Sequence, residues 1–447
     1  MQFRGLLTAA LVLAVLAGGV WWSNKAEKEK EGKPAPDAPP KIVEIPADQI
    51  RQVEIARSGE TLLVKRGEGD KWVIAAPREL RADQDAVSGL TGTFTSLSSD
   101  RLIEEKAADL KGYGLDSPAM TVTVTKKDGK PVKLLVGDET PTKGGFFVKL
   151  DGDPRVFTLA SFNKTSLDKS WKDLQDKRLL TFDSDKLSRI ELTVKGQTVE
   201  FGKNNNNEWQ IVRPKPLRAD GGQVEELVRK LKDAKLDTAT TEEDAKKAAA
   251  GFGGATLIGI AKATDAAGTQ QLEIRKDKDN YYAKSSAVEG VHKVTSDLGD
   301  SLNKSVDDFR NKKLFDFGWS DPTKIDIRDG AKTLSFQKQD DKWMGGGKQM
   351  DATSVQSLID KLRDLSATKF HDAGFTTAIF EAAVTSNEGK RVERVLISKA
   401  GDKYMAQRQG EPAVYEIDAK AFEELQRAAG DVKEPPPPQK KDEAKKK

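Results

Sequence analysis

Residues 50–55 read IRQVEI, and the same pattern returns as LSRIEL at residues 187–192 and as PTKIDI at 322–327. Each copy places two apolar side chains two positions apart, which is the spacing of a β-strand with one buried face. A turn follows, then a second alternating strand, then a third strand that carries a tryptophan. This order predicts an antiparallel meander in each copy. Its core positions are Val53, Ile190, Ile325, Trp72, Trp209 and Trp343.

The spacing of these positions is regular. From the strand residue to the tryptophan there are 19, 19 and 18 residues (72 − 53, 209 − 190, 343 − 325). Matched strands recur after 137 and 135 residues (190 − 53, 325 − 190). Self-similarity at a fixed period is the signature of a repeat architecture, so the sequence predicts three divergent copies of one unit. The tryptophans could stack on a ligand, but their inward-facing strand positions favour core packing.

A helix is expected after each tryptophan strand. Leu80–Asp83 and Leu217–Asp220 both read LRAD, and the third copy keeps the aspartate of that motif. Apolar residues at helical spacing follow, and an aspartate at this position can cap a helix by accepting from its first N–H groups. The predicted helix caps are Asp83, Asp220 and Asp351.

Four more strands and a second helix follow in each copy, so each reads βββα and then ββββα. The predicted fold class is α+β: three tandem repeats of a mixed antiparallel sheet with helices, forming an elongated array. The predicted segments are an anchor at 1–24, a charged Pro-rich spacer at 25–41, repeats at 42–181, 182–316 and 317–432, and a disordered Pro/Lys tail at 433–447.

The first 24 residues predict a single transmembrane helix. Leu6 to Trp22 is an uncharged apolar run, about 25 Å long as a helix, and Trp21 and Trp22 suit the membrane interface. The alternative is a cleaved signal peptide, because small residues stand at 17–19. Lysines follow the apolar run, and the positive-inside rule would keep them, and the domain behind them, in the cytoplasm. That rule weakens when a large domain follows the span. We expect the bulk of the protein in the periplasm, anchored in the inner membrane.

Composition excludes several kinds of chemistry. The 447 residues carry 74 basic and 71 acidic side chains, a formal net charge of +3, so nothing supports nucleic-acid binding. There is no cysteine, which excludes disulfides, thiol nucleophiles and cysteine-ligated zinc. His292 is expected on a strand and His371 in a loop, neither as a ligand or a catalyst. Residues 345–348, GGGK, lack the remaining residues of a phosphate-binding loop. We predict no catalytic residue, no cofactor and no metal.

Three short motifs carry a resemblance to a known family. They are Gly112–Pro118 (GYGLDSP), Val136-Gly137 at the end of a strand, and two D-[LF]-x-x-K-[RK]-L segments at 173–179 and 308–314. The sequence resembles, over about residues 42–430, a bacterial family catalogued as domain of unknown function number four-three-four-zero. The second copy keeps only Gly251-Phe252-Gly253 of the first motif.

The resemblance implies a function but supplies no site. Such proteins resemble membrane-anchored auxiliary components of ABC-2-type transporters, grouped with gliding-motility proteins. The expected role is therefore a non-enzymatic accessory or scaffold of the cell envelope, with the membrane and transporter subunits as partners. Two alternatives stay open: a carboxylate-dependent enzyme acting on envelope polymers, and a secreted binding protein if the N-terminal segment is cleaved.

Overall fold

The computed structural model describes residues 40–237, 242–318 and 322–437. The predicted anchor, with Trp21 and Trp22, lies outside these residues, as does most of the spacer and the end of the tail. No helix among the described residues is long and apolar enough to cross a membrane. The chain forms two compact units, one up to Lys177 and one from Arg178 onward. The second and third predicted repeats therefore share one compact unit.

The first unit contains one nine-stranded sheet in the order β5-β4-β3-β2-β8-β9-β10-β11-β7, beside a two-stranded β1–β6 pair. Its strands are β1 (Lys41–Val43), β2 (Ile50–Arg57), β3 (Glu60–Arg66), β4 (Trp72–Ala76), β5 (Leu80–Arg81), β6 (Leu97–Ser98), β7 (Arg101–Glu104), β8 (Met120–Lys126), β9 (Pro131–Glu139), β10 (Gly145–Leu150) and β11 (Val156–Ala160). Its helices are α2 (Gln84–Gly92), α3 (Ser161–Leu167) and α4 (Trp171–Leu174).

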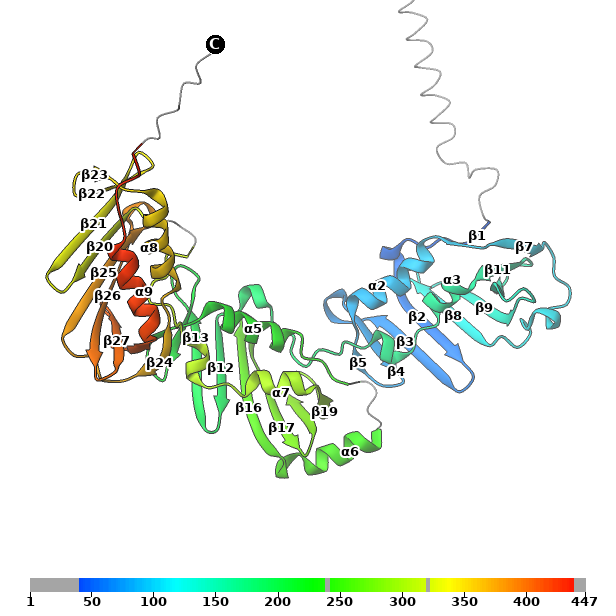
Figure 1. The fold of residues 1–447 in the computed structure, drawn as a ribbon. Helices are drawn as coiled ribbons and strands as arrows, with labels where there is room; N and C mark the ends of the chain where they lie inside the picture. The colour runs from blue at the N-terminus through cyan, green and yellow to red at the C-terminus, as the bar shows by residue number, and fades with distance from the viewer. Residues whose placement is uncertain (1–39, 238–241, 319–321, 438–447) are drawn as a thin grey trace, which may run out of the picture. The chain divides into compact units, whose positions relative to one another are not determined.

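The second unit contains two sheets (Figure 1). The second sheet runs β15-β14-β13-β12-β16-β17-β18-β19. Its strands are β12 (Arg189–Val194), β13 (Gln197–Lys203), β14 (Trp209–Arg213), β15 (Leu217–Arg218), β16 (Thr256–Asp265), β17 (Gly268–Asp277), β18 (Asn280–Ser285) and β19 (Val291–Val294). Its helices are α5 (Gly221–Lys232), α6 (Glu242–Gly251) and α7 (Ser296–Leu302).

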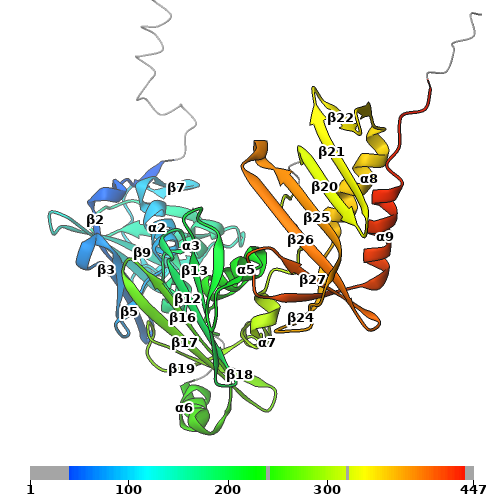
Figure 2. The ribbon, with the colours of Figure 1, turned by 90° about the vertical axis from the view of Figure 1, so that its left-hand side faces the viewer.

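The third sheet runs β23-β22-β21-β20-β25-β26-β27-β28-β24. Figure 2 shows α8 and α9 side by side against one face of it. Its strands are β20 (Lys324–Asp329), β21 (Lys332–Gln339), β22 (Lys342–Gly345), β23 (Lys348–Gln349), β24 (Ala367–His371), β25 (Ala378–Ser386), β26 (Arg391–Ala400), β27 (Lys403–Arg408) and β28 (Val414–Ile417). Its helices are α8 (Ala352–Asp364) and α9 (Ala419–Gly430).

The two predicted halves of each copy join into one sheet through a central antiparallel pair. These pairs are β2–β8, β12–β16 and β20–β25. In the first of them Val53 lies opposite Val124 and Ile55 opposite Val122, and all four side chains are buried. Period-2 alternation on both partners forces this register, since a one-residue slip would turn every apolar side chain towards solvent.

The structure adds elements that the strand pattern did not predict. A two-residue strand follows each tryptophan strand (β5, β15, β23), and β7 and β24 pair with the last strands of the first and third sheets. These strands are short or exposed, so they carry little alternation to detect. The prediction of a loop for His371 was wrong, because β24 pairs with β28 and places His371 opposite Val414. Residues 242–251 form α6, where no helix was predicted.

Candidate functional site

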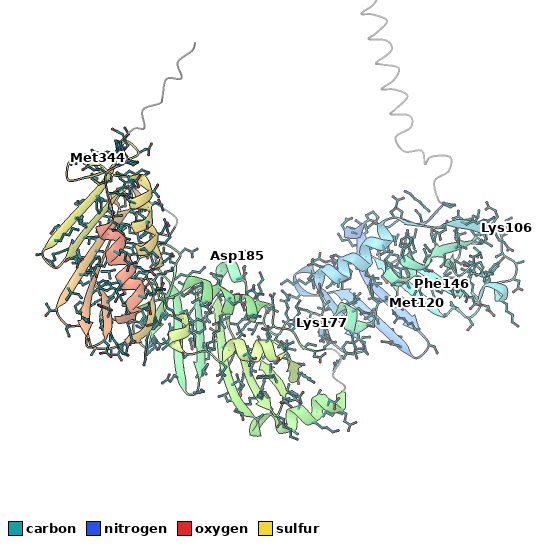
Figure 3. All side chains as sticks on the ribbon, viewed as in Figure 1. Lys106, Met120, Phe146, Lys177, Asp185 and Met344 are labelled. Carbon is teal, nitrogen blue, oxygen red and sulfur yellow. The ribbon has the colours of Figure 1, made fainter. Side chains whose placement is uncertain are left out.

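The six predicted core positions are all buried in the hydrophobic cores of the three sheets. Val53, Ile190 and Ile325 are fully buried, and the side chains of Trp72, Trp209 and Trp343 are 2%, 7% and 8% exposed. Met120 and Phe146, labelled on the first sheet in Figure 3, lie in or against the same core as Trp72.

A cationic side chain lies over the indole ring of two of the tryptophans, Trp72 and Trp209. The indole N–H of Trp209 donates to Glu225 Oε1 at 2.5 Å, and Lys203 Nζ lies 4.9 Å from the ring centroid. The guanidinium of Arg66 lies 4.1 Å from the ring centroid of Trp72. The rings of Trp72 and Trp209 are therefore covered by cations, and all three tryptophans are buried, which favours core packing over ligand stacking.

The three predicted capping aspartates stand at helix N-termini. Asp83 accepts from the backbone N–H groups of Asp85 and Ala86 at 3.0 and 3.1 Å. Asp220 and Asp351 each accept from the N–H three residues on, at 3.1 and 2.9 Å. These bonds satisfy N–H groups that a helix start would otherwise leave unpaired.

The histidines and the glycine-rich loop have ordinary surroundings. His292 lies on β19, as predicted, and its Nε2 is 2.8 Å from the carbonyl oxygen of Glu289. His371 Nε2 lies 2.7 Å from Glu416 Oε2, which Lys403 also contacts at 3.0 Å. Residues 345–348 form the turn between β22 and β23, with positive φ at both central glycines. Among the described residues, no group of three or more His, Cys, Asp or Glu is placed to hold a metal ion.

The two family-like motifs of the first copy pack against each other. A β-carbon on Gly137 would overlap the carbonyl oxygen of Tyr113, so only glycine lets the loop approach β9 this closely. The Tyr113 ring packs edge-on against Phe147 at 4.9 Å, and its hydroxyl donates to Glu104 Oε1 at 2.8 Å. That hydrogen bond, with a small contribution from burial, raises the pKa of Tyr113. Leu115, two residues on, is 2% exposed.

We expect Gly137→Ala to destabilise the first unit by about 1–3 kcal/mol, because the added methyl group must push the Tyr113 backbone away. Hydrogen exchange should report the loss at residues 110–118 and on β9. Gly144→Ala, at a glycine of the same unit without a positive φ and with no atom closer than 3.9 Å to the added methyl group, controls for the loss of a glycine. Equal protection of residues 110–118 in the wild type and in Gly137→Ala would contradict the close approach.

An extensive polar arrangement lies between the second and third sheets, within the second compact unit. Arg218, the last residue of β15, pairs through Nη1 with Asp316 and donates through Nη2 to the carbonyl oxygen of Lys313 at 2.6 Å. Its Nε lies 3.0 Å from Glu411 Oε1. The hydroxyl of Tyr415 accepts from Arg218 Nη2 at 3.4 Å and donates to Glu411 Oε2 at 2.7 Å. Arg218 therefore joins three segments at once.

A second layer of charges surrounds this arginine. Arg408 Nε donates to Glu411 Oε1 at 2.8 Å, and its Nη2 donates to Glu393 Oε1 at 3.0 Å. Glu393, with a side chain only 4% exposed, accepts from the backbone N–H of Asp316 at 3.0 Å. Asn311 donates its amide to both carboxylate oxygens of Asp316, at 3.0 and 3.1 Å. We call these residues, with Arg218 and Tyr415, the junction network.

The electrostatics of the junction network favour a charged Arg218 and a neutral Tyr415. Burial by itself disfavours the Arg218 guanidinium, but Tyr415, Asp316 and Glu411 outweigh it and raise the pKa of Arg218. Burial raises the pKa of Tyr415, and Glu411 raises it further against the opposing effect of Arg218. Because the charges neutralise one another at short range, the network is suited to holding two sheets together rather than to proton transfer.

The sequence contained a signal for this network that the prediction used only in part. Arg218 belongs to the LRAD motif, from which only the capping aspartate was singled out. Asn311 belongs to the D-[LF]-x-x-K-[RK]-L segment at 308–314. Both motifs recur in the first copy, and their recurrence could have indicated that they meet.

Comparison with known protein families gives one match. A family model described as a domain of unknown function (DUF4340) matches residues 72–249 and, again, 209–379. The two matches begin at Trp72 and Trp209, which open β4 and β14. No curated protein matches the chain.

Proposed function

This chain belongs to the DUF4340 family, and from that premise we propose that it is a non-enzymatic accessory scaffold of the bacterial cell envelope, an auxiliary partner of an ABC-2-type transporter. The observation that carries the proposal is the junction network. A scaffold must present its surfaces in a fixed geometry, and Arg218 ties the second and third sheets together with paired charges. An enzyme would instead keep such groups available to a substrate.

We further infer that the three sheets are tandem copies of one unit. The strand orders of the three sheets correspond, except that the second sheet has no counterpart of β7 and β24 among the described residues. The family model also matches twice, with a shift of 137 residues (209 − 72). Each sheet packs helices on the face that carries its tryptophan core, as the clusters around Trp72, Trp209 and Trp343 indicate, and only α6 of the second sheet lies on the other face among the described residues. Much of the opposite face is available for protein partners.

The proposed role is tested by purifying the tagged full chain from detergent-solubilised membranes of its own cells. We expect a transporter permease and its ATPase to co-purify with the chain. Arg218→Ala should lose these partners yet stay in the membrane fraction, whereas Arg229→Ala, an exposed arginine of α5, should keep them. A chain that purifies without any transporter subunit would contradict the role.

The proposal also places residues 42–430 outside the cytoplasm, held by an uncleaved N-terminal helix. We expect alkaline phosphatase fused after Lys447 to be active, and a fluorescent protein that folds only in the cytoplasm to stay dark there. The physical reason is the apolar run up to Trp22, which is just long enough to span a bilayer. Fluorescence without phosphatase activity would put the domains in the cytoplasm and remove the envelope role.

A further inference from the structure

Helix α6 lies on the opposite face of the second sheet from α5 and α7. Tyr281 packs in the main core with α5 and α7, and the next residue, Tyr282, packs in a separate small cluster. That cluster joins Ala248 of α6, Phe252 and Val291 of β19. Successive residues of a strand point to opposite faces, so α6 covers the far face at the β18–β19 end (Figure 1).

Arg275 fixes the end of this helix onto the sheet. Its Nη1 donates to the carbonyl oxygens of Gly253 and Ala255, both at 3.0 Å, and its guanidinium lies 5.3 Å from the centroid of the Phe252 ring. Phe252 is the aromatic residue of the Gly251-Phe252-Gly253 remnant. The corresponding connections in the first and third sheets contain no α-helix, so α6 is particular to the second sheet.

A cavity of about 520 Å³ lies between α6 and the sheet. This volume falls in the range of small-molecule sites, roughly 300–1,000 Å³. The groove is lined by Lys247 and Phe252 on the helix side and by Asp277, Asn280, Tyr282 and Lys293 on the strand side, and Asp237 and Asp244 add two further acidic groups. Among the described residues, the side chains of the four strand residues make no hydrogen bond or ion pair, so they are available to a ligand.

The groups in the groove define the chemistry of that ligand. Asp277 only accepts and Lys293 only donates, whereas the amide of Asn280 and the hydroxyl of Tyr282 do both. Both signs of charge line the groove, so neither a strong anion nor a strong cation is favoured throughout. The rings of Phe252 and Tyr282 add an apolar strip. A ligand that fits must carry many groups that both donate and accept, together with an apolar ring face.

We propose that the groove beneath α6 binds a neutral oligosaccharide. Sugar hydroxyls both donate and accept, and the C–H face of a pyranose ring packs on aromatic side chains. An extended peptide is the alternative, but peptides of that kind are held chiefly by main-chain hydrogen bonds to a strand edge. The edge strand here is β19, and the carbonyl oxygen of Lys293 on it already accepts from the backbone N–H of Asp237 at 3.1 Å. The walls of the groove are a helix and a sheet face, which present side chains. The site adds glycan recognition to the proposed scaffold and does not depend on the transporter.

Saturation-transfer NMR on the purified full chain tests the site. The probes are neutral tetrasaccharides of β-1,4-linked glucose, β-1,4-linked N-acetylglucosamine and α-linked mannose, an acidic tetrasaccharide, and a pool of hexapeptides. We expect signal from at least one neutral probe at millimolar concentration. Signal from the peptides or the acidic sugar alone, or from no probe, overturns the proposal.

Point variants locate the binding. Asn280→Ala and Lys247→Ala should each raise the Kd of the bound neutral probe at least fivefold, and together at least tenfold. Lys247 is exposed, and Asn280 is half-buried without a side-chain hydrogen bond to any described residue, so their variants should melt like the wild type. Asn206→Ala, at an exposed hairpin turn of the same sheet, is the matched control and should leave the Kd unchanged. A neutral probe whose Kd does not respond to Asn280→Ala or Lys247→Ala binds elsewhere, and the proposal fails.

Discussion

Replacing Trp209 by alanine should destabilise the second sheet by roughly 3–5 kcal/mol, because a buried aromatic side chain leaves a cavity that the core fills only in part. The residue is 7% exposed and packs in the same core as Phe201 and Ile211. Its loss also leaves Glu225 Oε1 without the indole donor. Native-state hydrogen exchange is the suitable measurement, since a chain with more than one compact unit does not unfold in a single step.

The control variants separate packing from hydrogen bonding. Glu225→Ala removes only the hydrogen-bond acceptor and should lower the free energy of unfolding by about 1 kcal/mol. Trp209→Phe keeps most of the ring volume, so its loss of stability should lie between those of Glu225→Ala and Trp209→Ala. Protection should drop on β12–β14 and stay unchanged in the first unit. Unchanged protection in Trp209→Ala, combined with loss of partner binding, would show that the tryptophan is a binding surface instead.

Arg218→Ala should lower the free energy of unfolding about as much as Trp209→Ala, by about 3–5 kcal/mol, but for an electrostatic reason. Removing one partner of a buried ion cluster leaves the others charged and desolvated, here Asp316 and Glu411. The side chain of Arg218 is 18% exposed, so water can replace little of what is lost. Hydrogen exchange should increase at residues 308–317 and on β28, which are the segments that Arg218 joins.

Matched substitutions show whether charge or volume matters. Arg218→Met keeps the length of the side chain without its charge and should remain strongly destabilised. Arg229→Ala removes an exposed ion pair on α5 and should cost at most about 0.5 kcal/mol. Equal effects of Arg218→Ala and Arg229→Ala would mean that the junction network does not hold the two sheets together.

The family-like motifs illustrate how a sequence pattern acquires its physical meaning. Gly112–Pro118 and Val136-Gly137 were recognisable as marks of the family, yet nothing in their spacing said that they touch. The structure brings the Tyr113 carbonyl against Gly137, which explains why a glycine stands at this position of β9. LRAD likewise predicted a cap at Asp220, whereas the role of Arg218 depends on residues about 100 to 200 positions away.

Local periodicity determined most of the strands, the helix that follows each tryptophan strand with its capping aspartate, and the buried positions of this protein. Alternation at Val53, Ile190 and Ile325, and an aspartate before each apolar helix, are properties of neighbouring residues, so they can be seen without the fold. The tertiary structure decided the junction network, the edge strands β7 and β24, and the groove beneath α6. These depend on contacts between residues far apart in the chain, and they involve strands too short, or side chains too scattered, to leave a periodic trace in the sequence.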